Sequence, residues 1–188
     1  MVWIKIIPPE QAEGRLAEAY AWQARQLGAP TTFTQLGSLE PELVHARLVL
    51  YRASERTSSN LTARQKNLIS HVVSSANSTP HCASRSVIKL RELGFSDEQI
   101  RAVESEHFED LAPEEAAVAR YALKLTRQPG SVTKDDIDAL RAAGLSDHDI
   151  LDANNQTAHL NYTNRVANGL GLLEEVAPDF PAFATVPD

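Results

Sequence analysis

The chain has 188 residues, of which 43% are hydrophobic and 23% are charged, and its formal net charge is −7 at pH 7. This size and composition are typical of one compact globular domain, to which we assign residues 1–188. The acidic balance and the scattered Lys and Arg residues argue against a nucleic-acid partner, because phosphate binding needs clustered cations. No apolar run reaches the roughly 18 residues of a membrane span, and no signal peptide is expected. We therefore predict a soluble, cytoplasmic protein without a membrane partner.

Apolar residues recur at a helical period along most of the chain. The pattern predicts helices over residues 13–27, 43–54, 61–77, 81–93, 113–127, 133–144 and 146–171. A less regular segment, residues 29–37, follows the first helix, and the proline-rich residues 176–188 are predicted to form a C-terminal arm. No comparable stretch alternates polar and apolar residues. The predicted fold class is therefore all-α.

Two segments of the chain resemble each other. Residues 90–103 and 140–153 share a Leu-Arg pair, a glycine, a Ser-Asp pair and an isoleucine at equal spacing. In each segment the glycine is predicted to end one helix and the serine to cap the next. Either this common arrangement has recurred by chance, or the chain contains two related helical hairpins packed about a pseudo-axis.

The only cysteine of the chain, Cys82, follows His81 in the stretch STPHCASRS. It has no partner for an intramolecular disulfide. If Thr79 caps a helix and Pro80 is its first residue, Cys82 is the third residue, where the helix dipole favours the thiolate and lowers the thiol pKa. His81 would add positive charge or transfer a proton. Alternatively, Cys82 is a small apolar residue of the core.

The predicted helix before Cys82 carries a polar stripe at helical spacing, formed by Arg64, Asn67, His71, Ser74 and Ser78. Such a stripe either faces solvent or lines a polar pocket, and its last turn points toward the His-Cys pair. In the last predicted helix, His159 shares a face with Asn155 and Tyr162. A second face of that helix is crowded with amides, which we expect to cap or bridge neighbouring helices.

The sequence offers little support for a metal or phosphate site. A zinc site needs three or four ligands, and Cys82 could gather His81, His71 and His159 only through folding, without any ligand spacing to indicate it. Glycine-rich phosphate loops and a serine nucleophile elbow are absent from the sequence. We expect no metal and no cofactor.

The run LTARQKNLISHVVSSANSTPHCASRSVI, residues 61–88, resembles the core of the alkylhydroperoxidase D-like, carboxymuconolactone decarboxylase superfamily, in particular its peroxidase-related branch. Residues 142–171 and the opening segments IPPEQAEGRLAEAY and PELVHARLVLYRA are also similar to that branch. The resemblance implies a bundle of helical hairpins, with the core motif at residues 61–93 and a second hairpin at residues 133–171. It also implies a homodimer, trimer or hexamer and an antioxidant, thiol-dependent peroxidase activity.

The resemblance is incomplete at the residues that carry the family's chemistry. In the family, two cysteines of a Cys-x-x-Cys motif reduce the peroxide, and a Glu and a His relay protons to the second cysteine. Cys82 matches the second, peroxidatic cysteine, but Thr79 stands at the first. Asn67 stands at the relay glutamate and Ser86 at the relay histidine. Asn and Ser act neither as a carboxylate base nor as an imidazole shuttle.

These departures leave two main hypotheses. In the first, Cys82 attacks a hydroperoxide, becomes a sulfenic acid and is reduced by an external thiol, which predicts fast alkylation of Cys82 at pH 7. In the second, the catalytically degenerate chain binds a small molecule, or performs non-redox chemistry, in a polar pocket formed by Asn67, His71, Ser86 and His159, so that His71→Ala weakens binding without unfolding the protein. Lactone decarboxylation, as in other superfamily members, has little support in the sequence.

Overall fold

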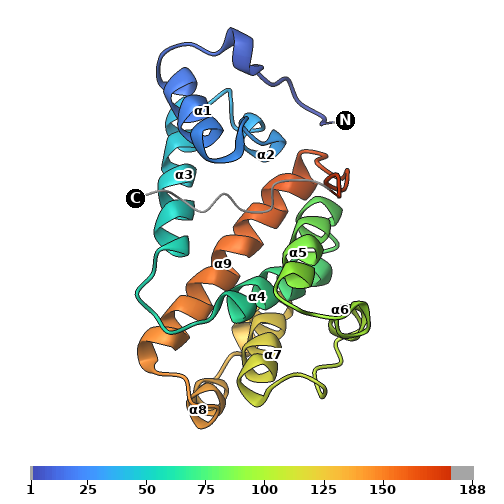
Figure 1. Cartoon of the computed structure of the whole chain (residues 1–188). Helices are drawn as coiled ribbons and strands as arrows, with labels where there is room; N and C mark the ends of the chain where they lie inside the picture. Colours follow the sequence, from blue (N-terminus) through green and yellow to red (C-terminus); the bar gives the residue numbers. More distant parts are fainter. Residues whose placement is uncertain (1, 179–188) are drawn as a thin grey trace.

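The computed structural model describes residues 2–178, and in this part of the chain the regular secondary structure is entirely helical (Figure 1). The helices are η1 (Pro9–Gln11), α1 (Gly14–Leu27), α2 (Thr32–Gln35), α3 (Pro41–Glu55), α4 (Ala63–Ala76), α5 (Pro80–Glu92), α6 (Asp97–Glu104), α7 (Pro113–Arg127), η2 (Pro129–Ser131), α8 (Lys134–Ala142) and α9 (Asp147–Gly169). The predicted all-α class is confirmed.

The helices form two groups joined by α9. In Figure 1, α1, α2 and α3 lie together at one end, and α4 to α8 lie at the other, with the long α9 running diagonally between them. The first group has a small core of its own, centred on Leu16, Tyr20 and Val44. The main core lies around α4, which packs against α5, α7 and α9.

Helix α4 is the central element, and its sequence explains why. Thr62 and Gln65 form a capping box at its start, in which each side chain bonds the backbone N–H of the other. Leu68, Ile69 and Val73 are completely buried. Because His71 and Ser74 of its polar stripe are buried as well, α4 is covered by neighbouring helices on several sides.

The start of α5 places Cys82 at the third residue, as the sequence predicted, with Thr79 at the cap position and Pro80 first. The Thr79 side chain makes no capping hydrogen bond, however, and its hydroxyl is buried without a partner among residues 2–178. Ser78, just before it, has a positive φ of 50°. The chain therefore enters α5 through a tight turn rather than a side-chain cap.

The two similar segments have the same local construction. Gly94 and Gly144 end α5 and α8 at φ values of 85° and 92°, in the left-handed region that favours glycine. The serine that follows each glycine by two positions forms a capping box. Even the flanking ion pair recurs, from Arg91 Nε to Asp97 Oδ1 at 2.8 Å and from Arg141 Nε to Asp147 Oδ1 at 3.0 Å. The sequence repeat is thus a repeated helix–turn–helix connection.

Two predicted segments without regular helices lie at residues 29–37 and at the C-terminal end of the chain. The less regular segment contains the short helix α2, whose first turn is capped by the Thr31 side chain. Of the predicted C-terminal arm, residues 176–188, only residues 176–178 lie within the described chain, and the remainder lies outside it. Within residues 2–178, every helix is too short or too polar to cross a membrane.

Candidate functional site

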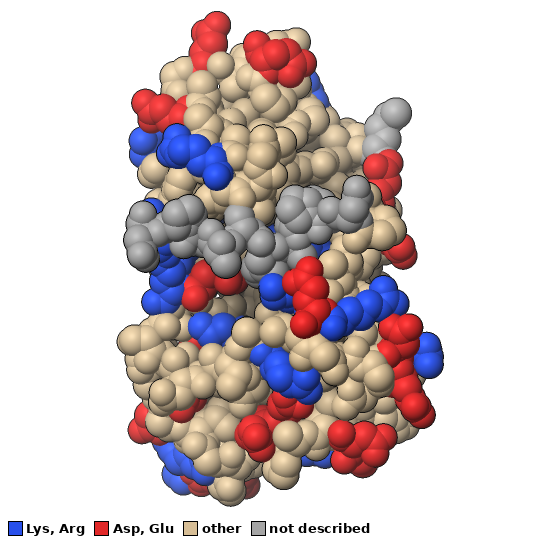
Figure 2. All heavy atoms as spheres, in the orientation of Figure 1, with Lys and Arg blue, Asp and Glu red and all other residues tan. Residues whose placement is uncertain are grey.

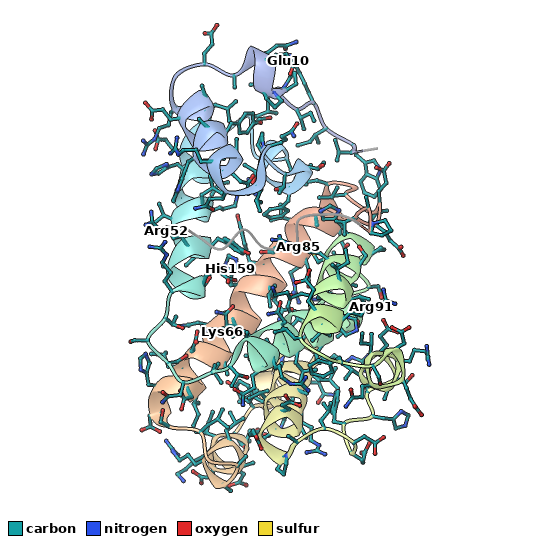
Figure 3. All side chains as sticks on the ribbon, viewed as in Figure 1. Glu10, Arg52, Lys66, Arg85, Arg91 and His159 are labelled. Atoms are coloured by element: carbon teal, nitrogen blue, oxygen red, sulfur yellow. The ribbon has the colours of Figure 1, made fainter. Side chains whose placement is uncertain are left out.

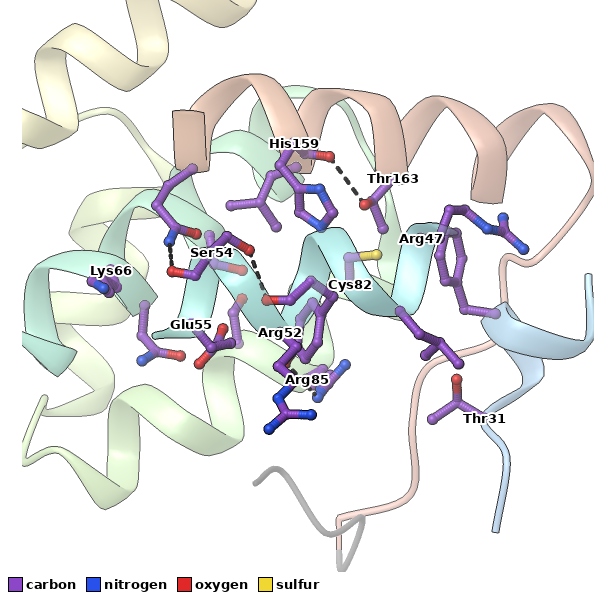
Figure 4. A pocket seen from close by; sticks show the side chains of 18 of the residues that line it. Thr31, Arg47, Arg52, Ser54, Glu55, Lys66, Cys82, Arg85, His159 and Thr163 are labelled. Atoms are coloured by element: carbon purple, nitrogen blue, oxygen red, sulfur yellow. Dashed lines mark hydrogen bonds between the residues drawn. The ribbon is translucent and has the colours of Figure 1, made fainter. Parts of the chain in front are cut away.

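A cavity of about 670 Å³ lies where the two groups of helices meet (Figure 4). Helices α1 and α3 line one side, and α4, α5 and α9 line the other. Its apolar wall contains Trp22, Leu27, Phe33, Val44, Leu48, Leu61 and Leu160. The volume falls within the range of small-molecule binding sites in proteins, which is roughly 300–1,000 Å³.

Cys82 lines this cavity and is partly exposed. Burial raises the pKa of the Cys82 thiol, and a hydrogen bond with Asn164 and the positive charge of Arg85 oppose that shift only in part. The prediction of a lowered thiol pKa was therefore wrong, because the loss of hydration on burial outweighs the two groups that lower the pKa. In the resting protein at neutral pH, Cys82 carries its proton.

His81 also lines the cavity, but it is not the cation that the sequence suggested. Burial lowers the pKa of the imidazole, so the ring is neutral at pH 7. Its Nδ1 atom lies 3.0 Å from the carbonyl oxygen of Glu174. Because a carbonyl oxygen only accepts, Nδ1 carries the ring proton and Nε2 is left as the basic nitrogen.

Five of the seven predicted site residues share the cavity, namely Asn67, His81, Cys82, Ser86 and His159. The other two, His71 and Thr79, are fully buried and do not belong to its lining. His71 packs behind Ser86, with its Nδ1 atom 2.9 Å from the Ser86 hydroxyl oxygen. The polar stripe of α4 thus faces neither solvent nor a single pocket, since Asn67 reaches the cavity while His71 and Ser74 are buried.

His159 is the imidazole of α9 that faces the cavity. Its ring centroid is 6.2 Å from that of Tyr51 on α3, and its Nδ1 atom is buried without a hydrogen-bond partner in the described part of the chain. Burial lowers its pKa, so the ring is neutral at pH 7 and able to accept a proton. Figure 4 shows His159 and Cys82 on walls of the same cavity.

The amides of α9 connect helices, as predicted. The Asn77 side chain at the end of α4 donates to the side-chain oxygens of Asn161 and Asn164 at 3.0 and 3.2 Å. Asn168 donates to the Asn77 carbonyl oxygen at 2.9 Å. Asn164 is completely buried and also bonds Ser74. This network holds α9 against α4 next to the Cys82 thiol.

Helix α3 supplies site residues that the sequence reasoning missed. Arg47 and Tyr51 are one helical turn apart and both line the cavity. Arg85 on α5 lies one turn after Cys82, and its Nη2 atom is 3.4 Å from the Tyr51 hydroxyl. The available signal was the pattern of Val44, Arg47, Leu48 and Tyr51, which places an arginine on an apolar helix face.

The cavity lining is rich in basic side chains although the protein is acidic overall. The lining contains six basic residues and one acidic residue, Glu55. The basic residues are Arg47, Arg52, Arg56, Lys66, Arg85 and Lys89. Figure 3 shows Lys66, Arg85 and His159 in the region between α3, α4, α5 and α9. On the surface view of Figure 2, Lys and Arg side chains lie across the middle of the face, interspersed with some acidic ones.

The residues that the structure describes provide no cluster of three or more His, Cys, Asp and Glu side chains able to hold a metal ion. His71, His81, His159 and Cys82, the ligands considered from the sequence, are divided between the cavity wall and the buried interior. The chemistry that the described site offers is therefore that of one thiol, neutral imidazoles and cationic side chains.

No protein-family model and no curated protein matches the sequence. Solved structures do match. An uncharacterized peroxidase-related protein from Ralstonia eutropha, described as an alkylhydroperoxidase AhpD core, is 21% identical with a TM-score of 0.83, over 100% of this chain and 98% of that chain. A second uncharacterized peroxidase-related protein, from a Silicibacter species, is 23% identical with a TM-score of 0.73, over 89% and 85% of the two chains.

A third similar structure is a cysteine-to-alanine variant of the debrominase Bmp8 in complex with 2,3,4-tribromopyrrole. It is 16% identical to this chain, with a TM-score of 0.73 over 95% of each chain. At these identities the likeness concerns the fold. The predicted resemblance is confirmed at that level, and the chain has the alkylhydroperoxidase D-like fold of the peroxidase-related proteins.

Proposed function

We propose that the protein is a thiol-dependent reductase of bulky organic substrates, with organic hydroperoxides as the first candidate class and Cys82 as its single redox residue. One observation carries the proposal: the only cysteine of the chain opens onto a cavity of about 670 Å³ with aromatic and aliphatic walls. Hydrogen peroxide would leave most of that space unfilled. An organic hydroperoxide would bury its carbon skeleton against Trp22, Phe33 and Leu160.

The proposed reaction has three steps. The Cys82 thiolate attacks the outer peroxide oxygen, the O–O bond breaks, and a proton completes the alcohol, which leaves a sulfenic acid. An external thiol then forms a mixed disulfide with Cys82 and releases water. A second external thiol reduces that disulfide and restores Cys82. Two thiols are oxidised for each hydroperoxide reduced, and the cytoplasm is the compartment that supplies them.

The raised pKa of Cys82 makes a base necessary. His159 is our candidate, because it is neutral, lines the same cavity and has a buried Nδ1 atom to which no described residue makes a hydrogen bond. Arg85 would stabilise the thiolate once it forms, since its charge already lowers the Cys82 pKa against the effect of burial. Neither role depends on Asn67 or Ser86 as replacements for the relay residues of the family.

Reduction of a carbon–halogen bond is a second candidate. The fold is shared with a debrominase whose structure holds a brominated pyrrole. Replacing a halogen by hydrogen is also a two-electron reduction, so the same pair of external thiols balances it. The aromatic side chains of Trp22, Phe33 and Tyr51 in the cavity lining suit a planar ring.

Stopped-flow oxidation of Cys82 tests the proposal, with intact mass to detect the sulfenic acid. Cumene hydroperoxide is expected to oxidise Cys82 with saturation, faster than hydrogen peroxide does, and an external thiol should reverse the reaction. His159→Gln should slow the oxidation, whereas His148→Gln, an exposed substitution on the same helix, should not. Brominated pyrrole with thiol, followed by bromide release, tests the second candidate. An inert Cys82 in both assays would contradict the proposal and favour the alternative of a catalytically degenerate binding protein.

We also propose that the protein is a homo-oligomer, as the family resemblance implies. Leu39, Leu43 and Leu50 are 57%, 46% and 51% exposed on or next to α3. Leu43 and Leu50 are seven residues apart and therefore lie on the same face of the helix. A second copy of this chain would cover these side chains.

A further inference from the structure

Arg47 is the most deeply buried cation of the cavity lining. Only 8% of the residue is exposed, whereas the other basic lining residues are half-buried or exposed. Burial lowers its pKa, which the nearby Tyr162 hydroxyl offsets only in part. A guanidinium that has lost its hydration is costly unless an anion compensates it.

Among the residues that the structure describes, no carboxylate forms an ion pair with Arg47. Its Nη2 atom is buried and has no hydrogen-bond partner within residues 2–178. The groups that hold the guanidinium do not neutralise it. It stacks on the Phe33 ring at 5.0 Å, and it packs against Gly37, where an added Cβ would lie only 1.9 Å from Nη2. The Arg47 side chain therefore fits closely between Phe33 and Gly37, while no described carboxylate compensates its charge.

The position of Arg47 relative to Cys82 fits substrate binding. Figure 4 shows Arg47 near Thr31 at one end of the cavity and Lys66 at the other end, with Cys82 between them. Val44 and Leu48, neighbours of Arg47 on α3, supply apolar surface beside it. A molecule that extends from Arg47 to the thiol would have a charged end and an apolar body.

We propose that Arg47 binds the carboxylate of an amphiphilic organic acid, whose reactive group then lies against Cys82. This inference deepens the proposed function by naming the substrate class and rests on it for the reaction, but the binding itself does not require a reactive thiol. The planar guanidinium pairs well with a carboxylate. A single buried Arg among apolar side chains fits a singly charged acid better than a strongly hydrated phosphate. Basic residues outnumber acidic ones in the lining by six to one, which also suits an anionic ligand, although Lys66 and Lys89 are already paired with Asp152 and Glu92.

The binding experiment uses the Cys82→Ser protein, so that thiol chemistry does not contribute. Octanoate and octan-1-ol serve as a matched anionic and neutral pair, measured by calorimetry at pH 7. Octanoate should bind at least about tenfold more tightly than octan-1-ol, since a charge-assisted hydrogen bond contributes about 1.5–3 kcal/mol. Equal affinities, or inorganic phosphate displacing octanoate at similar concentration, would overturn the proposal.

Substitutions of Arg47 and of a control arginine then test whether the carboxylate of octanoate binds at Arg47. Arg47→Met should reduce octanoate affinity about 10- to 100-fold and leave octan-1-ol binding within about twofold. Arg120→Met removes the same charge at an exposed position on α7 and should change neither affinity. Arg47→Met is expected to fold, because it removes a buried charge that has no ionic partner. Arg47→Lys, which keeps the charge but not the planar fork, should retain part of the octanoate affinity. Unchanged octanoate binding in folded Arg47→Met would also overturn the proposal.

Failure of the two proposals is distinguishable. If Cys82 is inert toward hydroperoxides and halogenated rings but octanoate binding depends on Arg47, the reductase proposal fails and the acid-binding site stands. If Cys82 reduces organic hydroperoxides while octanoate binds no better than octan-1-ol, the reductase proposal stands and the role of Arg47 is wrong.

Discussion

The Nδ1 atom of His71 lies 2.9 Å from the hydroxyl oxygen of Ser86, and this pair connects α4 to α5 directly behind the cavity wall. The Ser86 hydroxyl donates to the Ala83 carbonyl oxygen at 2.7 Å, so its oxygen accepts the Nδ1–H of His71. Ser86 reaches the cavity, but His71 does not. His71 therefore belongs to the packing of the protein rather than to a ligand pocket.

His71→Ala should consequently destabilise the protein, and any loss of ligand binding would follow from unfolding. The substitution leaves a void in a completely buried position and removes a partner of Ser86. Large-to-small changes of this kind cost roughly 2–5 kcal/mol. Urea unfolding measures the change in the free energy of unfolding. Loss of ligand affinity in a variant with wild-type stability would instead support the pocket role predicted from the sequence.

His71 should also make stability depend on pH. Burial lowers its pKa from 6.5 to about 4 in the folded protein. Glu104 lies 3.4 Å from Nε2, but 45% of its side chain is exposed, so it compensates little. Between these pKa values the unfolded chain binds more protons than the folded one. The contribution of neutral His71 to the free energy of unfolding is therefore present in full above about pH 6.5. It decreases as the pH is lowered toward 4, by on the order of 2 kcal/mol at pH 5. Unfolding of wild type and His71→Gln at pH 7 and pH 5 checks this, and an equal decrease in both proteins would contradict it.

Alkylation of Cys82 should be slow at pH 7. It should accelerate only at pH values above the pKa of an ordinary cysteine thiol, which is about 8.5. This follows from the raised pKa of the buried thiol. Arg85→Gln should move the midpoint to still higher pH, because it removes a charge that lowers this pKa, whereas Arg85→Lys should largely preserve it. Iodoacetamide labelling from pH 6 to pH 10.5, followed by mass spectrometry, gives the profile. Fast labelling at pH 7 would restore the prediction made from the helix dipole.

Asp152 should be important for stability although no sequence motif indicates it. The carboxylate is 2% exposed, accepts hydrogen bonds from Thr57 and Ser59, and pairs with Lys66 at 3.2 Å. Burial alone raises the pKa of the Asp152 carboxyl, but these hydrogen bonds outweigh it and hold the pKa below its usual range. The stabilisation is therefore present above about pH 4 and is lost only at lower pH.

Asp152→Asn is expected to lower the free energy of unfolding at pH 7 by roughly 2–4 kcal/mol, since it leaves Lys66 without its buried partner. Asp138→Asn is the matched control, because the ion pairs of Asp138 with Lys134 and Arg141 are exposed. Thermal and urea unfolding compare the two variants. Equal stabilities would show that the buried pair contributes no more than surface charges do.

A side chain at Gly144, where the second repeated connection begins, should destabilise the protein. Its φ of 92° costs an alanine about 1–2 kcal/mol, although no atom obstructs a Cβ there. Gly130 is the control, because its Cβ position is equally open and its φ is not in the left-handed region. Gly144→Ala should lower the melting temperature, and Gly130→Ala should not. The same change in both variants would mean that backbone conformation does not decide the difference.

The oligomer proposal predicts that the outer face of α3 controls assembly. The double substitution of Leu43 and Leu50 to Glu should reduce the mass measured by analytical ultracentrifugation. Leu151→Glu, at a leucine that is 57% exposed on α9, should leave the mass unchanged. A monomeric wild-type protein would contradict the proposal, and so would a double variant that keeps its size.

The sequence alone determined the local structure of this protein. Helical periodicity, glycine ends and serine caps act within a few residues, so the longer helices, the repeated connection and the place of Cys82 at the start of α5 could be predicted. The short helix α2 was not predicted. The resemblance of residues 61–88 to a known family predicted the fold. The amide bridges of α9 were also predictable, because so many amides in one helix are costly without partners.

Only the tertiary structure decided which side chains line the cavity and how burial shifts their pKa values. The helix-end argument for Cys82 failed because burial depends on how neighbouring helices cover the thiol, which periodicity does not encode. Periodicity also did not show that His159 lines the cavity whereas His71 is buried behind its wall, because this too depends on how the helices pack. Arg47 and Tyr51 joined the site because α3 packs across α9, far from Cys82 in sequence. Packing angles bring distant residues together and remove their hydration, and these two effects set the chemistry of the cavity.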